Sequence, residues 1–495
     1  MSIAIKHGYF KILRGGGGMF MKHIKMFRAA LTALVTVFAS LPVFAANIYY
    51  ASPSGTSTDC TMQSPGSLKQ ALAKVQGGTS WEDGDTIILL DSDSAYNISD
   101  AKEMSITAAF LTIRSENGNP DRAVIYRSGN SQRCFNVAAS VKFEGLTIKN
   151  FYLDTGGAAI YVGAIGESDS VIIDNCKFIQ NKANKLTAGV YSSSLNNDVT
   201  VKNSYFEGNT ATSGSCAYNI KKIEKCTFTG NTAPGNGLVA YSSNVYDSKF
   251  YKNTGTASST IGVVYGGSAT RCEFIDNTAI KSGGAVAYCA ATNCLIKGNS
   301  ATHGAASIGN CSLYGCRIES NSATYGICFE GATMNIINCL IVGNSLSATK
   351  HNSRDVFENC TLYNCTIVDN SISFAGGIMY NSGCAYNCIF RGNKPYDLRY
   401  VNKVVRANNC IYESANGYPA SATIYQEDPL FVTPSEKEPE YSLQRKSPAV
   451  NKGIDYGIFS ASDYDITGKK LRLNGLVDLG CYEYWPQSGF RIIVR

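Results

Sequence analysis

The chain has 495 residues, of which 17% are charged and 44% hydrophobic. This composition is too apolar for intrinsic disorder, and its wealth of Gly, Ser, Thr and Asn is typical of β-structure. Residues 1–45 hold six Lys and Arg but no Asp or Glu, so the remaining 38 of the 44 basic residues balance the 38 acidic ones. A balanced chain lacks the basic footprint of a nucleic-acid-binding protein, and we expect no nucleic-acid partner.

The first 45 residues have the pattern of a secretory signal peptide. Lys22, Lys25 and Arg28 precede an uncharged apolar run, Ala29 to Ala45, which ends in the small residues that a signal peptidase needs. We predict cleavage after Ala45 and export of a protein that is secreted or held at the bacterial cell surface, with outer-membrane association as one option. The alternative, a retained N-terminal anchor, lacks a stop-transfer pattern after the apolar run. After cleavage we expect no integral membrane segment.

Residues 46–135 are expected to form an N-terminal cap and the first coils of a solenoid. Ser67 suits the N-cap of a short helix. The apolar face of that helix comprises Leu68, Ala71, Leu72 and Val75. We predict that the helix covers the N-terminal end of the fold, where apolar core and strand edges would otherwise be exposed. The apolar segment 86–90 is expected to be the first strand.

Residues 136–415 contain ten copies of the pattern Cys/Ser-x-Phe/Ile-x-x-Asn, most often spaced by 22 residues. The repeat asparagines are Asn181, Asn209, Asn231, Asn253, Asn277, Asn299, Asn321, Asn344, Asn370 and Asn393. Repeats of this length mark solenoids, and residues two apart share a strand face, so Cys and Phe/Ile should both point inward. We predict an all-β fold: a right-handed parallel β-helix, like that of pectate lyases, with three-sided coils and the N-terminal capping helix.

The repeat Asn is expected to occupy the sharp turn after each strand, because Asn tolerates the left-handed backbone region. Stacked about 4.8 Å apart, the amides would hydrogen-bond along the axis as a ladder. On this interpretation Asn277→Ala or Asn299→Ala destabilises the fold by about 1–2 kcal/mol, and Gly at the same position does less harm.

The segment after each Asn carries a second motif, as in Gly283-Gly284-Ala285-Val286. Phe-x-x-Asn followed by Gly-Gly-Ala-Ile/Val resembles the repeats of the polymorphic outer membrane proteins, a family of bacterial surface β-helices. The resemblance covers about residues 140–415 and implies a coil type and a surface location rather than a chemistry.

Residues 416–495 are expected to form a C-terminal capping or anchor-associated region. Three segments occur in order: Asp428-Pro429-Leu430-Phe431, Ser447-Pro448-Ala449-Val450-Asn451 and Asp478-Leu479-Gly480-Cys481-Tyr482-Glu483. The series resembles the C-terminal part of the choice-of-anchor β-helix proteins, which implies that this region closes the helix and precedes a surface-attachment tail.

Most of the eighteen cysteines fall in two inward columns of the predicted coil. The first column holds Cys176, Cys226, Cys272, Cys294, Cys316, Cys339, Cys365, Cys388 and Cys410, and the second holds Cys289, Cys311, Cys360 and Cys384. Such residues behave as small buried hydrophobes, so we predict mostly reduced thiols, although stacked neighbours are close enough for a few inter-coil disulfides. Neither Cys-x-x-Cys nor paired His occurs, and we expect no metal and no other cofactor.

Two classes of function stay open. Many right-handed β-helices are polysaccharide lyases or glycoside hydrolases, which need grouped carboxylates or Arg and Lys in a groove. Here the acidic residues of the coils are scattered, and the one compact polar group is Lys350, His351, Arg354 and Asp355 in a lengthened coil. We therefore assign no catalytic residue and favour a non-catalytic protein for adhesion or carbohydrate binding, with a lyase or hydrolase acting on an extended glycan as the alternative.

A tyrosine follows the repeat Asn in many coils. The series is Tyr161, Tyr191, Tyr218, Tyr241, Tyr265, Tyr288 and Tyr380. If Cys289 points inward, alternation sends Tyr288 outward, and neighbouring tyrosines would form an exposed strip. We hypothesise that Tyr241, Tyr265 and Tyr288 bind an extracellular polysaccharide or a cell-surface glycan by stacking ring faces on sugars. The alternative is that the rings pack on one another to cover a corner of the coil.

Overall fold

The computed structural model describes residues 46–486, apart from 100–102, 130, 330–333, 348–355, 359, 374–377, 381–382, 400–405, 417–423, 436–438, 460–462 and 472–475. The predicted signal peptide, residues 1–45, and the chain end, 487–495, lie outside the described residues.

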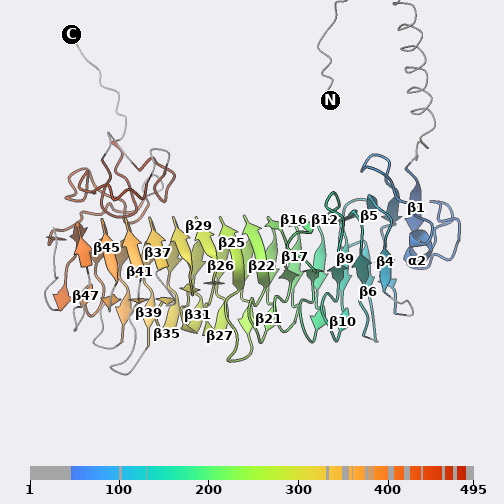
Figure 1. Cartoon of the computed structure of the whole chain (residues 1–495), viewed down its shortest axis with the longest axis horizontal. Coiled ribbons are helices and arrows are strands. Elements are labelled where there is room, and N and C mark those ends of the chain that lie inside the picture. The colour runs from blue at the N-terminus through green and yellow to red at the C-terminus, as the bar shows by residue number, and fades with distance from the viewer. Residues whose placement is uncertain are drawn as a thin grey trace, which may run out of the picture. The chain divides into compact units, whose positions relative to one another are not determined.

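The described chain is a stack of parallel coils whose strands form three long sheets (Figure 1). Successive coils supply adjacent strands of sheet B, the 15-stranded sheet. Its strands are β3 (Tyr96–Asn97), β6 (Val124–Tyr126), β9 (Thr147–Lys149), β13 (Lys177–Ile179), β17 (Tyr205–Glu207), β20 (Thr227–Thr229), β23 (Lys249–Tyr251), β26 (Glu273–Ile275), β30 (Leu295–Lys297), β34 (Arg317–Glu319), β38 (Leu340–Val342), β42 (Thr366–Val368), β46 (Ile389–Arg391), β49 (Cys410–Ile411) and β51 (Ile424–Tyr425).

Sheet A, with 27 strands, takes two consecutive segments from most coils, which merge in the longest strands, β22 and β25. Its strands are β1 (Ile48–Ala51), β2 (Thr86–Leu89), β4 (Met104–Ile106), β5 (Leu111–Ser115), β7 (Phe135–Val137), β8 (Val141–Glu144), β11 (Ile160–Val162), β12 (Ser170–Asp174), β15 (Val190–Ser192), β16 (Asp198–Lys202), β18 (Ala217–Tyr218), β19 (Lys222–Glu224), β22 (Ala240–Tyr246), β25 (Val264–Thr270), β28 (Val286–Ala287), β29 (Ala290–Thr292), β32 (Ser307–Ile308), β33 (Ser312–Tyr314), β36 (Cys328–Phe329), β37 (Met334–Ile337), β40 (Phe357–Glu358), β41 (Cys360–Tyr363), β44 (Met379–Tyr380), β45 (Cys384–Tyr386), β47 (Leu398–Arg399), β48 (Arg406–Asn408) and β50 (Ala415–Asn416).

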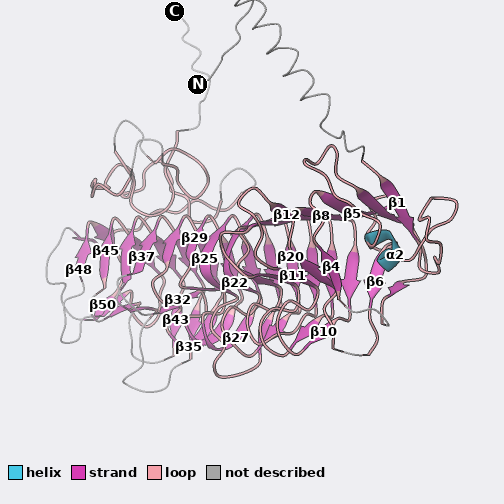
Figure 2. Ribbon diagram, turned by 45° about the vertical axis from the view of Figure 1, so that its right-hand side comes forward, coloured by secondary structure: helices cyan, strands magenta, loops and turns pink. Residues whose placement is uncertain are grey.

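Sheet C has seven strands, fewer than the other two long sheets, and completes the coil (Figure 2). It comprises β21 (Thr232–Ala233), β24 (Thr254–Gly255), β27 (Thr278–Ser282), β31 (Ser300–His303), β35 (Ser322–Tyr325), β39 (Ser345–Leu346) and β43 (Ser371–Ile372), and a separate pair, β10 (Tyr152–Leu153) and β14 (Lys182–Ala183), precedes it in the chain. The predicted parallel solenoid with three strand-bearing sides is thus confirmed, although sheet A bends across two segments.

The inward column of Phe and Ile runs through the repeats as predicted. Phe178 pairs in register with Phe206, which pairs with Phe228, and the column continues to Phe390 without a shift. Ring centroids from Phe178 to Phe274 are 4.6–4.8 Å apart, and these side chains are fully buried. Because identical rings stack at the strand spacing, each coil buries its apolar side against the next one.

The amide ladder is also confirmed. All ten repeat asparagines are buried, and each of the first nine donates from Nδ2 to Oδ1 of the next over 2.9–3.1 Å. Each also donates its backbone N–H to that same oxygen over 2.8–3.0 Å. The ladder therefore satisfies the polar groups of a corner that lies inside the core.

The expected backbone conformation of these asparagines was wrong. In every repeat the residue with positive φ, between 50° and 66°, is the one before the Asn: Gln180, Gly208, Gly230, Lys252, Asp276, Gly298, Ser320, Gly343, Asp369 or Gly392. The turn residue has to point outward, whereas the amide has to point inward to reach its neighbours. One residue cannot do both, so the chain divides the two tasks between adjacent positions.

The ladder has a defined direction and a charged end. Every hydrogen bond between two ladder amides points toward the C-terminal coils, and the last amide, Asn393, donates 2.8 Å to Oδ1 of the buried Asp397. The other oxygen of Asp397 accepts from the backbone N–H groups of Glu413 and Ser414. Burial raises the pKa of Asp397, and these donors work against that rise. A carboxylate at the donor end of aligned amides is the favourable sign, as for a charge at a helix terminus.

The thiol prediction holds. All eighteen cysteines are free, and all except Cys384 are buried. Within the first column, neighbouring coils are linked by weak backbone N–H to Sγ contacts, such as Cys272 to Cys294 at 3.4 Å. The assignment of Cys384 to the second column was wrong, because it pairs with Thr361 and not with Cys360. That shift of one residue turns its side chain to the half-exposed face.

Thiol titration should therefore find about one reactive group in the native protein and eighteen after denaturation. Burial raises the pKa of Cys176 and of Cys226 to about 12, which suppresses the reactive thiolate. Cys384→Ser should abolish the native reaction and leave the denatured count one lower. Many reactive native thiols would contradict the closed core.

The N-terminal region differs from expectation in its first strand. β1 precedes the predicted segment 86–90 and pairs in parallel with β2, so the stack starts one strand earlier. Between them lies the helix α2 (Leu68–Leu72), and Ser67 Oγ accepts from the backbone N–H of Gln70. Leu68 and Ala71 are buried against β1, β2 and β4. That this helix serves as the cap of the solenoid stays a prediction.

The described part of the C-terminal region lies against the side of the coils, over the outer face of sheet B. Leu443, Ala449 and Leu479 pack on Ile389 and Ile411, whose side chains point out of the coil. Gly480 comes so close that an added Cβ would lie 2.5 Å from Thr366 Oγ1. Strands such as β38 and β46 are apolar on both faces and need cover on the outside as well. That this region closes the end of the helix stays a prediction.

Candidate ligand-binding face of sheet A

Five of the predicted tyrosines form one outward column on sheet A. Tyr161, Tyr191, Tyr218, Tyr241 and Tyr265 pair in register from β11 to β25. Their centroids are 4.7–5.3 Å apart with interplanar angles of 3–23°, so they form a continuous stack, which we call the tyrosine ladder together with Tyr288. The side chain of Tyr380 lies outside the described residues.

Tyr288 belongs to the ladder by contact but not by register. Ala287 occupies the column position beside Tyr265 and is buried, while Tyr288 follows at a corner with φ of 50°. Its ring turns back to lie 5.3 Å from that of Tyr265, tilted by 53°, and is 50% exposed. Gly309, on the next coil, leaves room for it, because an added Cβ there would be 2.7 Å from the ring. Cys289 points inward as predicted.

The expected stacking of sugars on ring faces is not possible within the ladder, since neighbouring tyrosines already cover those faces. At the N-terminal end the guanidinium carbon of Arg133 lies 4.3 Å from the centroid of Tyr161, which covers that face too. The exposed parts are ring edges and hydroxyls, and none of the six hydroxyls has a hydrogen-bond partner among the described residues. Burial beside the other rings raises the pKa of Tyr191, Tyr218 and Tyr265, so these hydroxyls remain protonated donors.

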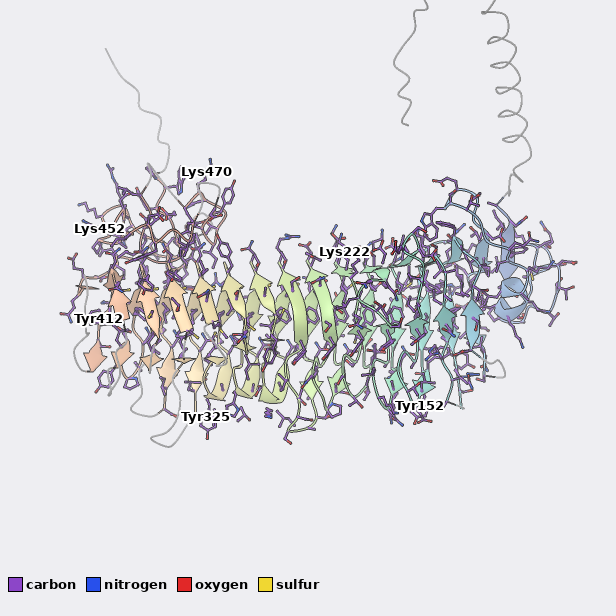
Figure 3. The ribbon with its side chains drawn as sticks, viewed as in Figure 1. Tyr152, Lys222, Tyr325, Tyr412, Lys452 and Lys470 are labelled. Atoms are coloured by element: carbon purple, nitrogen blue, oxygen red, sulfur yellow. The ribbon has the colours of Figure 1, made fainter. Side chains whose placement is uncertain are left out.

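A row of charges runs along the second segment of sheet A. Glu144, Asp174, Lys202 and Glu224 occupy one outward column on adjacent coils. Their ion pairs are Lys142 with Glu144 (2.8 Å), Lys202 with Asp174 (3.2 Å) and Lys222 with Glu224 (2.8 Å). Figure 3 shows Lys222 on the edge of the stack away from Tyr152 and Tyr325. The sequence signal for Asp174, Lys202 and Glu224 is the position two residues before the inward Cys or Ser, whereas Glu144 stands two residues before the inward Leu146.

The row continues at the next corner with an Arg–Asp pair. Arg271 donates to both oxygens of Asp247, at 2.6 and 2.8 Å, and so lowers the pKa of that carboxyl. The hydrogen bond from Lys222 likewise lowers the pKa of Glu224. These carboxylates stay ionised and are tied to cations. A general base poised near neutral pH would need the opposite shift.

The described residues give no support to a metal site or to a catalytic role for the remaining polar residues. In the described part of the chain no three His, Cys, Asp or Glu residues are placed to hold a metal ion. The polar group Lys350, His351, Arg354 and Asp355 lies outside the described residues. His303 stacks on Tyr325 at 4.9 Å on sheet C, away from the charge row. No helix among the described residues is long and apolar enough to cross a membrane.

Comparison with known proteins defines the fold further. The family described as right handed beta helix region matches residues 133–301. The coils form a right-handed parallel β-helix. No curated protein sequence matches the chain. The specific resemblances to polymorphic outer membrane proteins and to choice-of-anchor proteins stay hypotheses.

Several solved structures are similar. The alginate lyase AlyF-OU02, in complex with G6, has 12% identity over 83% of this chain and 94% of its own, with a TM-score of 0.45. A PL6 alginate lyase in complex with a trisaccharide has 11% identity over 81% and 93%, with a TM-score of 0.38. The A-module of the mannuronan C-5 epimerase AlgE4 of Azotobacter vinelandii has 12% identity over 72% and 96%, with a TM-score of 0.29. At such identities the likeness is one of fold alone.

Proposed function

We propose that the protein binds an extended polysaccharide along the tyrosine ladder without cleaving it. The observation that carries this proposal is the ladder itself: six hydroxyls that have no partner in the described part of the chain, repeated at about the strand spacing along sheet A. A polysaccharide repeats its own hydroxyls at a comparable interval, so one chain laid along the axis meets an equivalent donor on each coil.

The ladder also meets the physical needs of such a surface. Stacked rings are held by one another, so little side-chain entropy is lost when a ligand binds. Tyrosine presents an apolar edge beside a hydroxyl, which suits the mixed polar and apolar surface of a sugar. The adjacent row of paired charges keeps the face hydrated and adds further donors and acceptors, such as Lys222 and Glu224.

We further propose that the chain works outside the cell, exported by residues 1–45 and held at the bacterial surface. The support is the sequence of the leader and the resemblances to surface β-helix families. N-terminal sequencing of the protein released by cells that express it should begin at Ala46. A mature protein that still starts before Lys22 would contradict export by this route.

The ladder is tested with two triple variants of Tyr241, Tyr265 and Tyr288. The Phe variant keeps the stack and removes three hydroxyls, so we expect the melting temperature of wild type and at least tenfold weaker binding on a polysaccharide array. The Ala variant removes the rings as well, so it should bind no better than the Phe variant and should have a lower melting temperature than wild type. Unchanged binding by a folded Phe variant would overturn the role of the hydroxyls, and no polysaccharide binding by wild type would overturn the proposal.

The alternative, a lyase for acidic polysaccharides, has one observation in its favour. Lys222, Lys225 and Arg271 gather around Glu224 and Asp247 on adjacent coils. Cations can neutralise a uronate carboxylate while a base removes the neighbouring proton and the glycosidic oxygen leaves, which creates a carbon–carbon double bond. Incubation with polyuronates, followed by ultraviolet absorbance of unsaturated ends, decides between cleavage and binding. An increase in absorbance with wild type that is absent with the Arg271→Ala variant would favour the lyase.

A further inference from the structure

A pocket of about 620 Å³ lies where the C-terminal region meets the coils. Its coil side is formed by Arg271, Asn293 and Tyr314, at the corner between sheets A and B. Its other side is formed by the segment 463–468, including Asp463 and Tyr464. The tyrosine ladder supplies none of the lining residues, so this pocket is a separate feature of the molecule.

The pocket exists because of one column of corner residues. Asn338, Asn364, Asn387 and Asn409 precede inward cysteines and have φ of 48–56°. Each donates from Nδ2 to a backbone carbonyl of the C-terminal region, those of Tyr464, Asp478, Ile454 and Lys452 respectively, over 2.6–3.1 Å. The amides of this column thus hold the C-terminal region against the coils by hydrogen bonds to its backbone carbonyls. Figure 3 labels Lys452 and Lys470 in that region.

The same column continues past the docked region with its next amide unused. Gly315 has no side chain to fill the space, and an added Cβ there would be 2.3 Å from Asn293 Oδ1. Asn293 has φ of 52°, is exposed, and its side-chain amide has no partner among the described residues. The pocket therefore begins at the first amide of the column, Asn293, that has no backbone carbonyl of the described C-terminal region to bind.

The groups around the pocket are those that recognise a sugar. Asn293 offers a donor and an acceptor, and Arg271 keeps N–H groups beyond the two that hold Asp247. Tyr314 is half-buried, and burial together with Asp463 raises its pKa to about 12, so its hydroxyl remains a donor. Tyr464 is 49% exposed and adds an aromatic surface for the apolar side of a ring.

We propose that this pocket binds one neutral sugar unit, at the end of a glycan or as a free monosaccharide. Acidic residues on the C-terminal side, Asp463 and Asp465, disfavour a uronate there, and the positive charge of Arg271 is matched by Asp247. The volume suits one or two sugar rings rather than a long chain. The site is independent of the proposal for the tyrosine ladder.

The test uses the purified chain and saturation-transfer NMR with neutral monosaccharides and disaccharides, and with galacturonate as the acidic probe. Wild type should bind at least one neutral sugar and bind galacturonate more weakly. Asn293→Gly keeps the left-handed backbone and removes only the amide, so we expect about three- to tenfold weaker binding. Tyr464→Ala should weaken binding similarly.

Two controls separate this site from the ladder. Asn203→Gly removes an exposed corner amide of the same column that bonds Asp174, far from the pocket, and should bind neutral sugars as wild type does. The Phe variant of the ladder should retain the small sugar while losing polysaccharide. The pocket proposal would be overturned if wild type bound no neutral sugar, or if Asn293→Gly and Tyr464→Ala both bound it as tightly as wild type. Either result would leave the ladder proposal standing.

Discussion

Replacing Asn277 by Ala is expected to lower the free energy of unfolding by about 3–5 kcal/mol. The side chain is fully buried and joins three coils: Oδ1 accepts from both the backbone N–H and Nδ2 of Asn253, and Nδ2 donates to Phe250 O and to Asn299 Oδ1. Ala would leave two donors of Asn253 in the core without an acceptor, and each such group costs about 1–3 kcal/mol. Urea denaturation followed by circular dichroism measures the change.

Asn277→Gly should be as harmful as Ala, which reverses the expectation from sequence alone. Glycine relieves strain only at positive φ, and that conformation belongs to Asp276. The matched control is Lys252→Gly, at the exposed turn residue before Asn253, where φ is 50°. This change should leave stability equal or slightly higher, because Gly already stands at that turn position at 208, 230 and 298. A neutral Asn277→Ala would mean that water enters and replaces the amide.

The second large effect is a loss of stability of the C-terminal region as the pH rises. Asp478 and Glu483 are buried, and the backbone N–H of Asp478 donates to Glu483 Oε1 over 3.0 Å. Burial, with the nearby acidic groups, raises the pKa of Asp478 to about 6 and that of Glu483 to about 9. The folded region thus holds protons that the unfolded region would release.

The stabilising effect of the bound protons is fully present below the unfolded pKa values near 4, and it is lost as the pH rises through about 6 and then about 9. For Asp478 alone, a shift of this size corresponds to about 3 kcal/mol. Limited proteolysis and hydrogen exchange from pH 4 to 9.5 should show the segment 428–484 protected at acidic pH and opened at alkaline pH, while the coils stay closed.

Glu483→Gln is the matched control, because it keeps an oxygen for the N–H of Asp478 and carries no charge. The opening near pH 9 should vanish, and the step near pH 6 should persist. A region that opens at acidic pH instead would show that the carboxylates are ionised in the folded state, and would contradict the assigned pKa directions.

The amino-acid sequence determined the coil and its interior. A spacing of 22 residues with Cys, Phe/Ile and Asn at fixed offsets leaves one physical solution, since inward positions have to stack on their own copies in the next coil. The Phe column, the amide ladder and the buried free thiols follow from that condition, as seen at Phe206, Asn231 and Cys226. Periodicity could not say which of two adjacent residues makes the turn, because both Asn231 and Gly230 tolerate it.

The tertiary structure decided what depends on neighbouring coils and on distant segments. Whether tyrosines present their faces or cover one another depends on ring rotation, and Tyr288 left the column because its coil has Ala287 in that place. The described residues of the segment 428–484 pack on the side of sheet B and join positions more than 60 apart, such as Asn387 and Ile454. A repeat fixes the contacts inside it, but an outward side chain is constrained only by what comes to lie against it, so the surface sites required the folded chain.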